Sequence, residues 1–157
     1  MNARIAVLDD EHRMAEVLAM VLRRDGHEVE TFNEASLCLA ALETARFDLL
    51  MTDLKMPEMD GVEVLRRAKA LLPDLPVILV TAHATVKTAI SAMREGAFDY
   101  VQKPFANEAC RALVSRALEV TRLSRENRRL RGALLARYGL DHVVAQSPGM
   151  SAVLDLA

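Results

Sequence analysis

The sequence of 157 residues contains no tryptophan and few aromatic residues, which make up only 4% of the chain. Because hydrophobic residues still amount to 52%, aliphatic side chains must build most of the core. No apolar run approaches the roughly 18 residues that a membrane span needs, and no signal-peptide pattern precedes the first apolar segment. We therefore expect a cytoplasmic protein without a membrane partner.

Cysteine is also scarce, and its two copies lie far apart in the chain. Cys38 and Cys110 belong to no CxxC motif and to no cluster of cysteine and histidine. This spacing argues against a zinc site of the usual kind and against a disulfide framework. We expect two reduced cysteines that pack in the core.

Charge is distributed unevenly, although the formal net charge is only −2. Residues 1–104 hold 17 acidic and 12 basic residues, whereas residues 105–140 hold 3 acidic and 8 basic ones. The change of sign near residue 105 predicts a boundary between an acidic domain and a basic extension.

Short apolar runs alternate with segments of helical periodicity in the acidic part. The predicted strands are residues 5–8, 27–32, 47–52, 77–80 and 98–101. Apolar stripes with helical spacing lie between them; one example is Met14, Val17, Leu18, Val21 and Leu22, and the stripe of the fourth helix is Val86, Ala89, Ile90 and Met93. This order predicts an α/β fold with a doubly wound parallel sheet, followed by an extended helix from about residue 106.

Polar residues of complementary chemistry stand at the ends of four predicted strands. Asp9 and Asp10 follow the first strand, Asp53 the third, Thr81 the fourth and Lys103 the fifth. In a parallel sheet these ends meet at one edge, where ligands bind. Neighbouring carboxylates repel one another, so we expect a hard divalent cation between them. With a lysine and a hydroxyl to stabilise charge, this set suits transfer of a phosphoryl group to an aspartate.

Four segments resemble the receiver domain of bacterial response regulators, which histidine kinases phosphorylate in two-component systems. These segments are IAVLDD (5–10), DLLMTDLKMPEMDG (48–61), PVILVTA (76–82) and GAFDYVQKPF (96–105). They stand in the order found in that family, and they assign residues 1–105 to a receiver domain. The resemblance implies a flavodoxin-like (βα)5 fold. It also implies no enzyme activity in this chain beyond its own phosphorylation and dephosphorylation.

The resemblance implies a phosphoacceptor and a metal site. Asp53 would accept the phosphoryl group. Mg²⁺ or Mn²⁺ would be bound directly by Asp10 and Asp53, through water by Asp9, and by the backbone carbonyl of Lys55.

The resemblance also implies which residues take part when the domain changes conformation after phosphorylation. Lys103 corresponds to the lysine that acts with the phosphoacceptor in this family. Thr81 and Tyr100 correspond to the two residues of its conformational switch. The peptide bond before Pro104 would be cis.

Beyond this domain the chain resembles a particular group of response regulators. Residues 88–105 resemble receivers attached to σ54-dependent AAA+ transcription activators of the NtrC and DctD type. The segment VVAQSPGM (143–150) resembles the start of the ATPase domain in these activators, although Ala145 stands where glycine is usual. We therefore expect residues 141–157 to begin a truncated AAA+ domain. The full-length protein would be an ATPase that acts with σ54-RNA polymerase and DNA.

Residues 106–140 form the predicted linker helix, and they carry two series of residues spaced by seven. The a positions of a coiled coil would be Leu113, Val120, Asn127 and Leu134, and the d positions Ala109, Arg116, Leu123 and Leu130. Asn127 favours a parallel two-stranded pairing, whereas Arg116 argues against a tight seam in its turn. We expect a homodimer. A solvated tether and a basic helix that binds DNA are the alternatives.

Three other functions compete with that of a signalling receiver. A phosphatase of the haloacid dehalogenase kind also uses an aspartate and Mg²⁺, but it needs a DxD motif, and Leu54-Lys55 follows Asp53. A flavin- or nucleotide-binding protein needs a loop that cradles phosphate where Asp9 and Asp10 would repel it. A pseudo-receiver that only binds partners would not need the complete set of aspartates, threonine and lysine.

Overall fold

The computed structural model of the chain describes residues 2–82 and 85–138. The predicted AAA+ segment at 141–157 therefore lies outside the described residues. Contacts divide the chain into two units, Met1–Thr121 and Arg122–Ala157, which are described separately.

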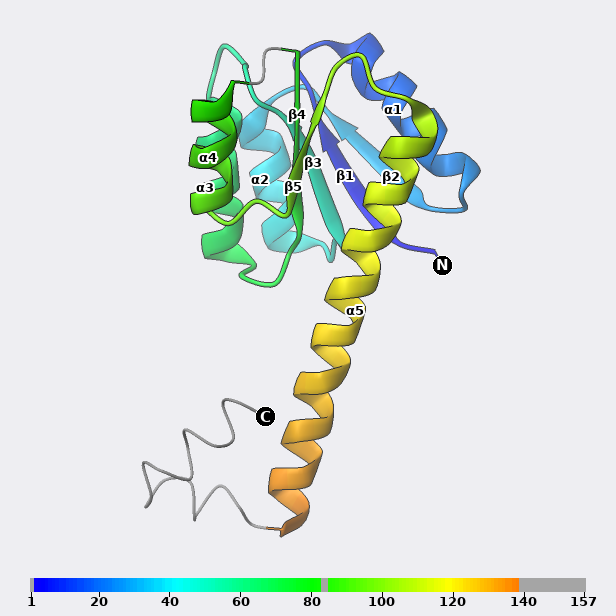
Figure 1. The fold of residues 1–157 in the computed structure, drawn as a ribbon, viewed down its shortest axis with the longest axis vertical. Helices are drawn as coiled ribbons and strands as arrows, with labels where there is room; N and C mark the ends of the chain where they lie inside the picture. The colour runs from blue at the N-terminus through cyan, green and yellow to red at the C-terminus, as the bar shows by residue number, and fades with distance from the viewer. Residues whose placement is uncertain (1, 83–84, 139–157) are drawn as a thin grey trace. The chain divides into compact units, whose positions relative to one another are not determined.

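Five strands and five helices alternate along the described residues, as Figure 1 shows. The strands are β1 (Arg4–Leu8), β2 (Glu28–Phe32), β3 (Leu49–Asp53), β4 (Val77–Thr81) and β5 (Asp99–Gln102). The helices are α1 (His12–Arg24), α2 (Ala35–Thr44), α3 (Gly61–Leu71), α4 (Val86–Arg94) and α5 (Asn107–Tyr138). The predicted elements are all present, with ends shifted by a few residues.

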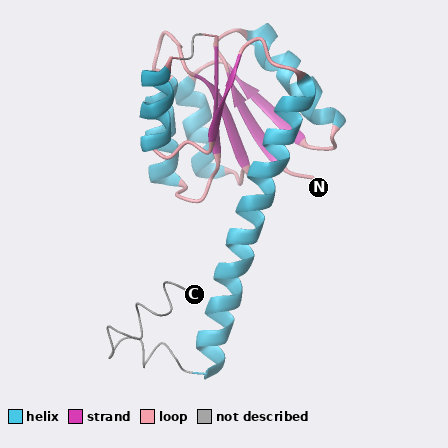
Figure 2. Ribbon diagram, viewed as in Figure 1, coloured by secondary structure: helices cyan, strands magenta, loops and turns pink. Residues whose placement is uncertain are grey.

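The strands form one parallel sheet in the order β2-β1-β3-β4-β5, and helices cover both of its faces (Figure 2). Because successive side chains of a strand point to opposite faces, the buried residues divide into two clusters. Ala6, Leu50 and Leu79 pack with α2, α3 and α4, whereas Ile5 and Met51 pack with α1 and the first turns of α5. The prediction of a doubly wound, flavodoxin-like fold is confirmed.

The two cysteines lie in different clusters. Cys38 packs in the cluster with α2, and Cys110 in the cluster with α1; both are buried and free of disulfides. Burial raises the pKa of the Cys38 thiol to about 12 and that of Cys110 to about 11. Both thiols therefore stay protonated and act as core residues, as predicted.

Helix α4 forms where the apolar spacing predicts a helix, but its large apolar residues are exposed. Val86, Ile90 and Met93 are 77%, 49% and 47% exposed, and the buried residue of this helix is Ala92. Ala92 packs in the buried cluster on this face of the sheet.

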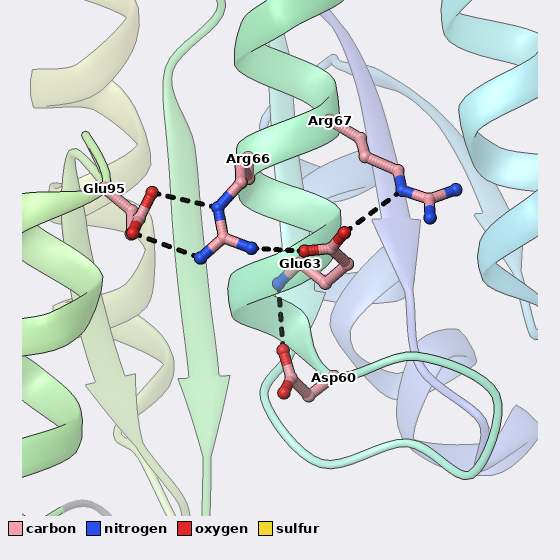
Figure 3. Close-up of polar contacts among 5 residues, drawn as sticks. All are labelled: Asp60, Glu63, Arg66, Arg67 and Glu95. Carbon is pink, nitrogen blue, oxygen red and sulfur yellow. Dashed lines mark hydrogen bonds and ion pairs between the residues drawn. The ribbon is translucent and has the colours of Figure 1, made fainter.

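A chain of charged residues joins the end of α4 to α3 (Figure 3). Asp60 caps α3 by accepting the Glu63 backbone N–H at 2.8 Å. The Glu63 carboxylate binds both Arg66 and Arg67, and Arg66 in turn donates to both oxygens of Glu95 at 3.1 and 3.2 Å. These pairs are exposed and add little stability individually. Their fork geometry nevertheless fixes where the end of α4 lies against α3.

Helix α5 presents two kinds of apolar residue. In the first unit, Cys110, Val114, Ala117 and Leu118 are buried against the sheet. Of the large residues in the predicted seam, Leu113 is partly buried and packs against the same cluster. The others are about half exposed: Val120 50%, Leu123 53%, Leu130 58% and Leu134 47%. In the described ranges no helix is long and apolar enough to cross a membrane.

Candidate functional site

The structure brings the predicted strand-end residues together at the carboxyl edge of the sheet. Because β1 and β3 are neighbours, carboxylate oxygens of Asp9, Asp10 and Asp53 all lie within 4.8 Å of one another. An open hollow of about 440 Å³ lies beside them. Its lining includes Asp10, Asp53, Lys55, Thr81 and Lys103.

Lys103 ties two of these carboxylates together. Its Nζ lies 3.0 Å from Asp9 Oδ2 and 3.7 Å from Asp53 Oδ1, and the side chains of Lys103 and Asp53 are both 13% exposed. Asp9 Oδ1 also accepts the Glu11 backbone N–H at 2.9 Å. Asp9 is therefore held by protein donors on both oxygens, whereas Asp10 is exposed at the edge of the hollow.

Asp53 occupies the last position of β3, and its charge is unfavourable there. Burial raises the pKa of its carboxyl group most, and the nearby Asp9 and Asp10 raise it further. Lys103 and the Leu54 backbone N–H, which donates to Asp53 Oδ1 at 2.8 Å, oppose this rise only in part. A cation bound among the carboxylates would favour the ionised form.

Gly61 supports the backbone at this aspartate. Its N–H donates to the Leu54 carbonyl oxygen at 2.6 Å, which ties the start of α3 to the end of β3. A Cβ atom at position 61 would lie 2.5 Å from the Asp53 carbonyl oxygen and 2.8 Å from Leu54 Cα. Both neighbours are backbone atoms, so they cannot rotate away.

We expect Gly61→Ala to lower the free energy of unfolding by about 1–3 kcal/mol, because the new methyl group overlaps the backbone beside Asp53. Urea denaturation measures the change. Gly132→Ala is the matched control, since a Cβ there meets nothing within 4 Å. An unchanged urea midpoint for Gly61→Ala would contradict this prediction, because it would show that the backbone at Asp53 and Leu54 moves aside without a loss of stability.

The two predicted switch residues are placed differently. Thr81 ends β4, is buried and lines the hollow. Tyr100 lies on β5 opposite Leu79 and is 39% exposed. The structure therefore brings Thr81 to the site and holds Tyr100 outward. The Lys103–Pro104 peptide is cis, as the resemblance implied.

Sequence reasoning missed contacts that depend on the fold. The backbone donors at Glu11 and Leu54 carry no sequence signal, and nothing in the sequence marks the close approach of Gly61 to Asp53. Arg116, predicted at a d position, donates to Asp99 Oδ2 at 2.9 Å, and its guanidinium lies 5.5 Å from the centre of the Phe98 ring. The proximity of these residues could not be read from their spacing.

This sheet order, with three carboxylates, a threonine and a lysine at its carboxyl edge, defines a flavodoxin-like α/β domain with an acidic site. Residues 5–115 match the family model described as "Response regulator receiver domain". The chain belongs to the response regulator receiver domain family, and it is a receiver of the two-component kind.

Relatives and solved structures agree with this assignment. The C4-dicarboxylate transport transcriptional regulatory protein DctD of Pseudomonas aeruginosa is 39% identical over 154 residues, which cover 95% of this chain and 32% of DctD. NtrX from Brucella abortus matches with a TM-score of 0.79 and 36% identity over 83% of this chain and 30% of NtrX. A CheY-like receiver domain protein from Methanospirillum hungatei matches with a TM-score of 0.76 and 28% identity over 79% of this chain and 99% of that protein. The chain spans about a third of the length of the curated relatives it matches.

Proposed function

We propose that Asp53 accepts a phosphoryl group from a histidine kinase, and that this change controls a σ54-dependent transcription-activating ATPase in the full-length protein. The observation that carries the proposal is the carboxylate cluster with Lys103 between Asp9 and Asp53. The similarity to the transcriptional regulator DctD supports the second part. Within this chain we assign no turnover beyond the phosphorylation and dephosphorylation of Asp53.

The oxygen donors at the site fit Mg²⁺ or Mn²⁺. Asp10 and Asp53 would hold the cation directly, Asp9 through water, and Lys55 through its backbone carbonyl. When bound, the cation supplies positive charge that stabilises the phosphoryl group during transfer.

In the proposed reaction Asp53 Oδ2 attacks the phosphorus of the donor, because Oδ1 already accepts the Leu54 N–H. A new P–O bond forms as the bond from phosphorus to the donor's leaving atom breaks, and the leaving group keeps the electron pair. Lys103 lies close enough to neutralise a phosphoryl oxygen. The Thr81 hydroxyl would donate to another, and its movement would let Tyr100 turn inward from its exposed position.

We expect the purified chain to gain one phosphoryl group when incubated with acetyl phosphate and Mg²⁺. Intact-mass spectrometry measures the gain, and peptide mapping should place it on Asp53. Excess EDTA should abolish it, because the carboxylates and Lys103 alone leave the negative charge of the transferred group unbalanced. Labelling that proceeds equally in EDTA, or no labelling at all, would contradict the proposal.

We expect Mg²⁺ to raise the free energy of unfolding, because it binds only the folded arrangement of carboxylates. A concentration ten times the Kd should add about 1.4 kcal/mol. Asp10→Ala should remove this dependence, while Asp60→Ala, which alters a helix cap outside the cluster, should keep it. Thermal denaturation at several Mg²⁺ concentrations measures both. Equal Mg²⁺ dependence in Asp10→Ala and in the unaltered chain would rule out Asp10 as a ligand.

For the output we propose a parallel homodimer through α5. The half-exposed residues Val120, Leu123, Leu130 and Leu134 would form its apolar seam, with Asn127 as the polar residue that sets register. Parallel pairing would place the two ATPase domains of the dimer at the same end of the coiled coil. In this scheme the predicted receiver (1–105), linker helix (106–140) and AAA+ start (141–157) are successive parts of one signalling path.

A further inference from the structure

Arg116 poses a problem for the proposed dimer helix. It occupies a d position one turn before Val120, where apolar residues are favoured. In a symmetric parallel pair the two copies of Arg116 would meet at the same level of the seam. Two like charges brought together and partly removed from water oppose pairing.

The structure shows where this side chain goes instead. The Arg116 guanidinium donates to Asp99 Oδ2 at 2.9 Å and lies over the ring of Phe98, both at the start of β5. The charge is therefore held against its own receiver domain. The pair is open to solvent, with Arg116 61% and Asp99 34% exposed, so it adds little to the stability of one chain.

Asp99 also connects this ion pair to the switch strand. Its other oxygen, Oδ1, accepts the backbone N–H of Tyr100 at 2.8 Å. One carboxylate thus contacts both the backbone of the proposed switch residue and the arginine of the dimer helix. A movement of the β5 backbone at Tyr100 would shift the carboxylate that accepts from Arg116.

We infer that Asp99 is a positioning residue for the dimer: it holds Arg116 out of the α5 seam and thereby couples the state of β5 to the strength of pairing. The inference rests on the proposed dimer function. When Asp99 holds the arginine, the seam can close from Val120 onward without facing charges. When the contact is lost, Arg116 is free to reach the seam and weaken it.

The test is sedimentation equilibrium on the whole chain for Asp99→Asn, Arg116→Leu and the double variant. Asparagine keeps an oxygen for the Tyr100 N–H but removes the charge that holds Arg116. Asp99→Asn should raise the dimer Kd about fivefold to tenfold, and added salt should shrink the difference. Arg116→Leu should lower the Kd, and the double variant should match Arg116→Leu alone.

Asp25→Asn is the matched control. Asp25 forms an ion pair with Arg111, which also lies on α5 but outside the a and d positions. Its loss should leave the dimer Kd unchanged. At a concentration where both chains are monomeric, the urea midpoint of Asp99→Asn should equal that of the unaltered chain, which separates a positioning role from a structural one.

Two results would overturn the inference while the dimer stands. One is an unchanged Kd for Asp99→Asn, and the other is an equal rise of Kd when Asp99→Asn is added to Arg116→Leu. A chain that stays monomeric at high micromolar concentration in every variant would instead overturn the proposed dimer, and this inference with it.

Discussion

Asp53→Asn should reduce phosphoryl incorporation from acetyl phosphate to background. Asparagine has nearly the shape of aspartate and can still accept the Leu54 N–H, but its amide nitrogen is no nucleophile at neutral pH. Intact-mass spectrometry in the presence of Mg²⁺ measures the loss. Asp48→Asn is the control, because Asp48 stands just before the same strand and its carboxylate accepts the Arg4 backbone N–H outside the carboxylate cluster. Asp48→Asn should label normally.

Without Mg²⁺ and at neutral pH, Asp53→Asn should be at least as stable to unfolding as the unaltered chain. The raised pKa of Asp53 means that folding disfavours its ionised form, so its charge costs stability once pH exceeds the carboxyl range. Asparagine removes that cost. Urea denaturation therefore distinguishes a lost nucleophile from a damaged fold. Normal labelling of Asp53→Asn would place the phosphoacceptor elsewhere.

Leu123→Asp combined with Leu130→Asp should convert the dimer to a monomer. Each leucine is about half exposed in one chain, so pairing has about 1 kcal/mol to gain from burying each. Four copies in a dimer then contribute about 4 kcal/mol, which corresponds to roughly a thousandfold change in Kd. Sedimentation equilibrium at micromolar concentration measures the effect.

Ser115→Asp combined with Gly132→Asp is the control for added charge. Both positions lie on α5 outside the a and d series, so these acids stay away from the seam. This variant should remain dimeric. If the unaltered chain is itself monomeric at high micromolar concentration, α5 is a tether, and the coiled-coil interpretation is wrong.

The meeting of the strand-end residues at one site could be predicted because the topology of a parallel sheet forces it. In a parallel sheet, the carboxyl ends of β1, β3, β4 and β5 must meet at one edge. The proximity of Asp53, Thr81 and Lys103 therefore follows from the strand order, without any measured distance. The half-exposed stripe of α4 could not be predicted in the same way. Periodicity shows that a helix has an apolar side, but not whether another element covers it, and α4 buries Ala92 instead.

Contacts between side chains remote in sequence were equally out of reach. The pairing of Arg116 with Asp99 depends on how α5 lies beside β5, and a heptad count assigns Arg116 only to the seam. The close approach of Gly61 to Asp53 depends on the path of the loop between β3 and α3. In both cases the residues can be read from the sequence, but the contact between them cannot.

The position of each strand in the sheet separates two properties of this protein. Asp9 and Asp10 follow β1 and Asp53 ends β3, two strands whose apolar residues are buried on both faces of the sheet. The residues proposed to report the signal lie on β4 and on β5, whose side chains alternate between partly buried and exposed at the margin. Under the proposed function, substitutions at the exposed positions of β5 would therefore alter the signal passed to partners and leave the carboxylates in place, whereas Lys103, which directly follows β5, belongs with the carboxylates. Such an arrangement would let the signal passed to partner proteins change in evolution while the site proposed for phosphorylation stays the same.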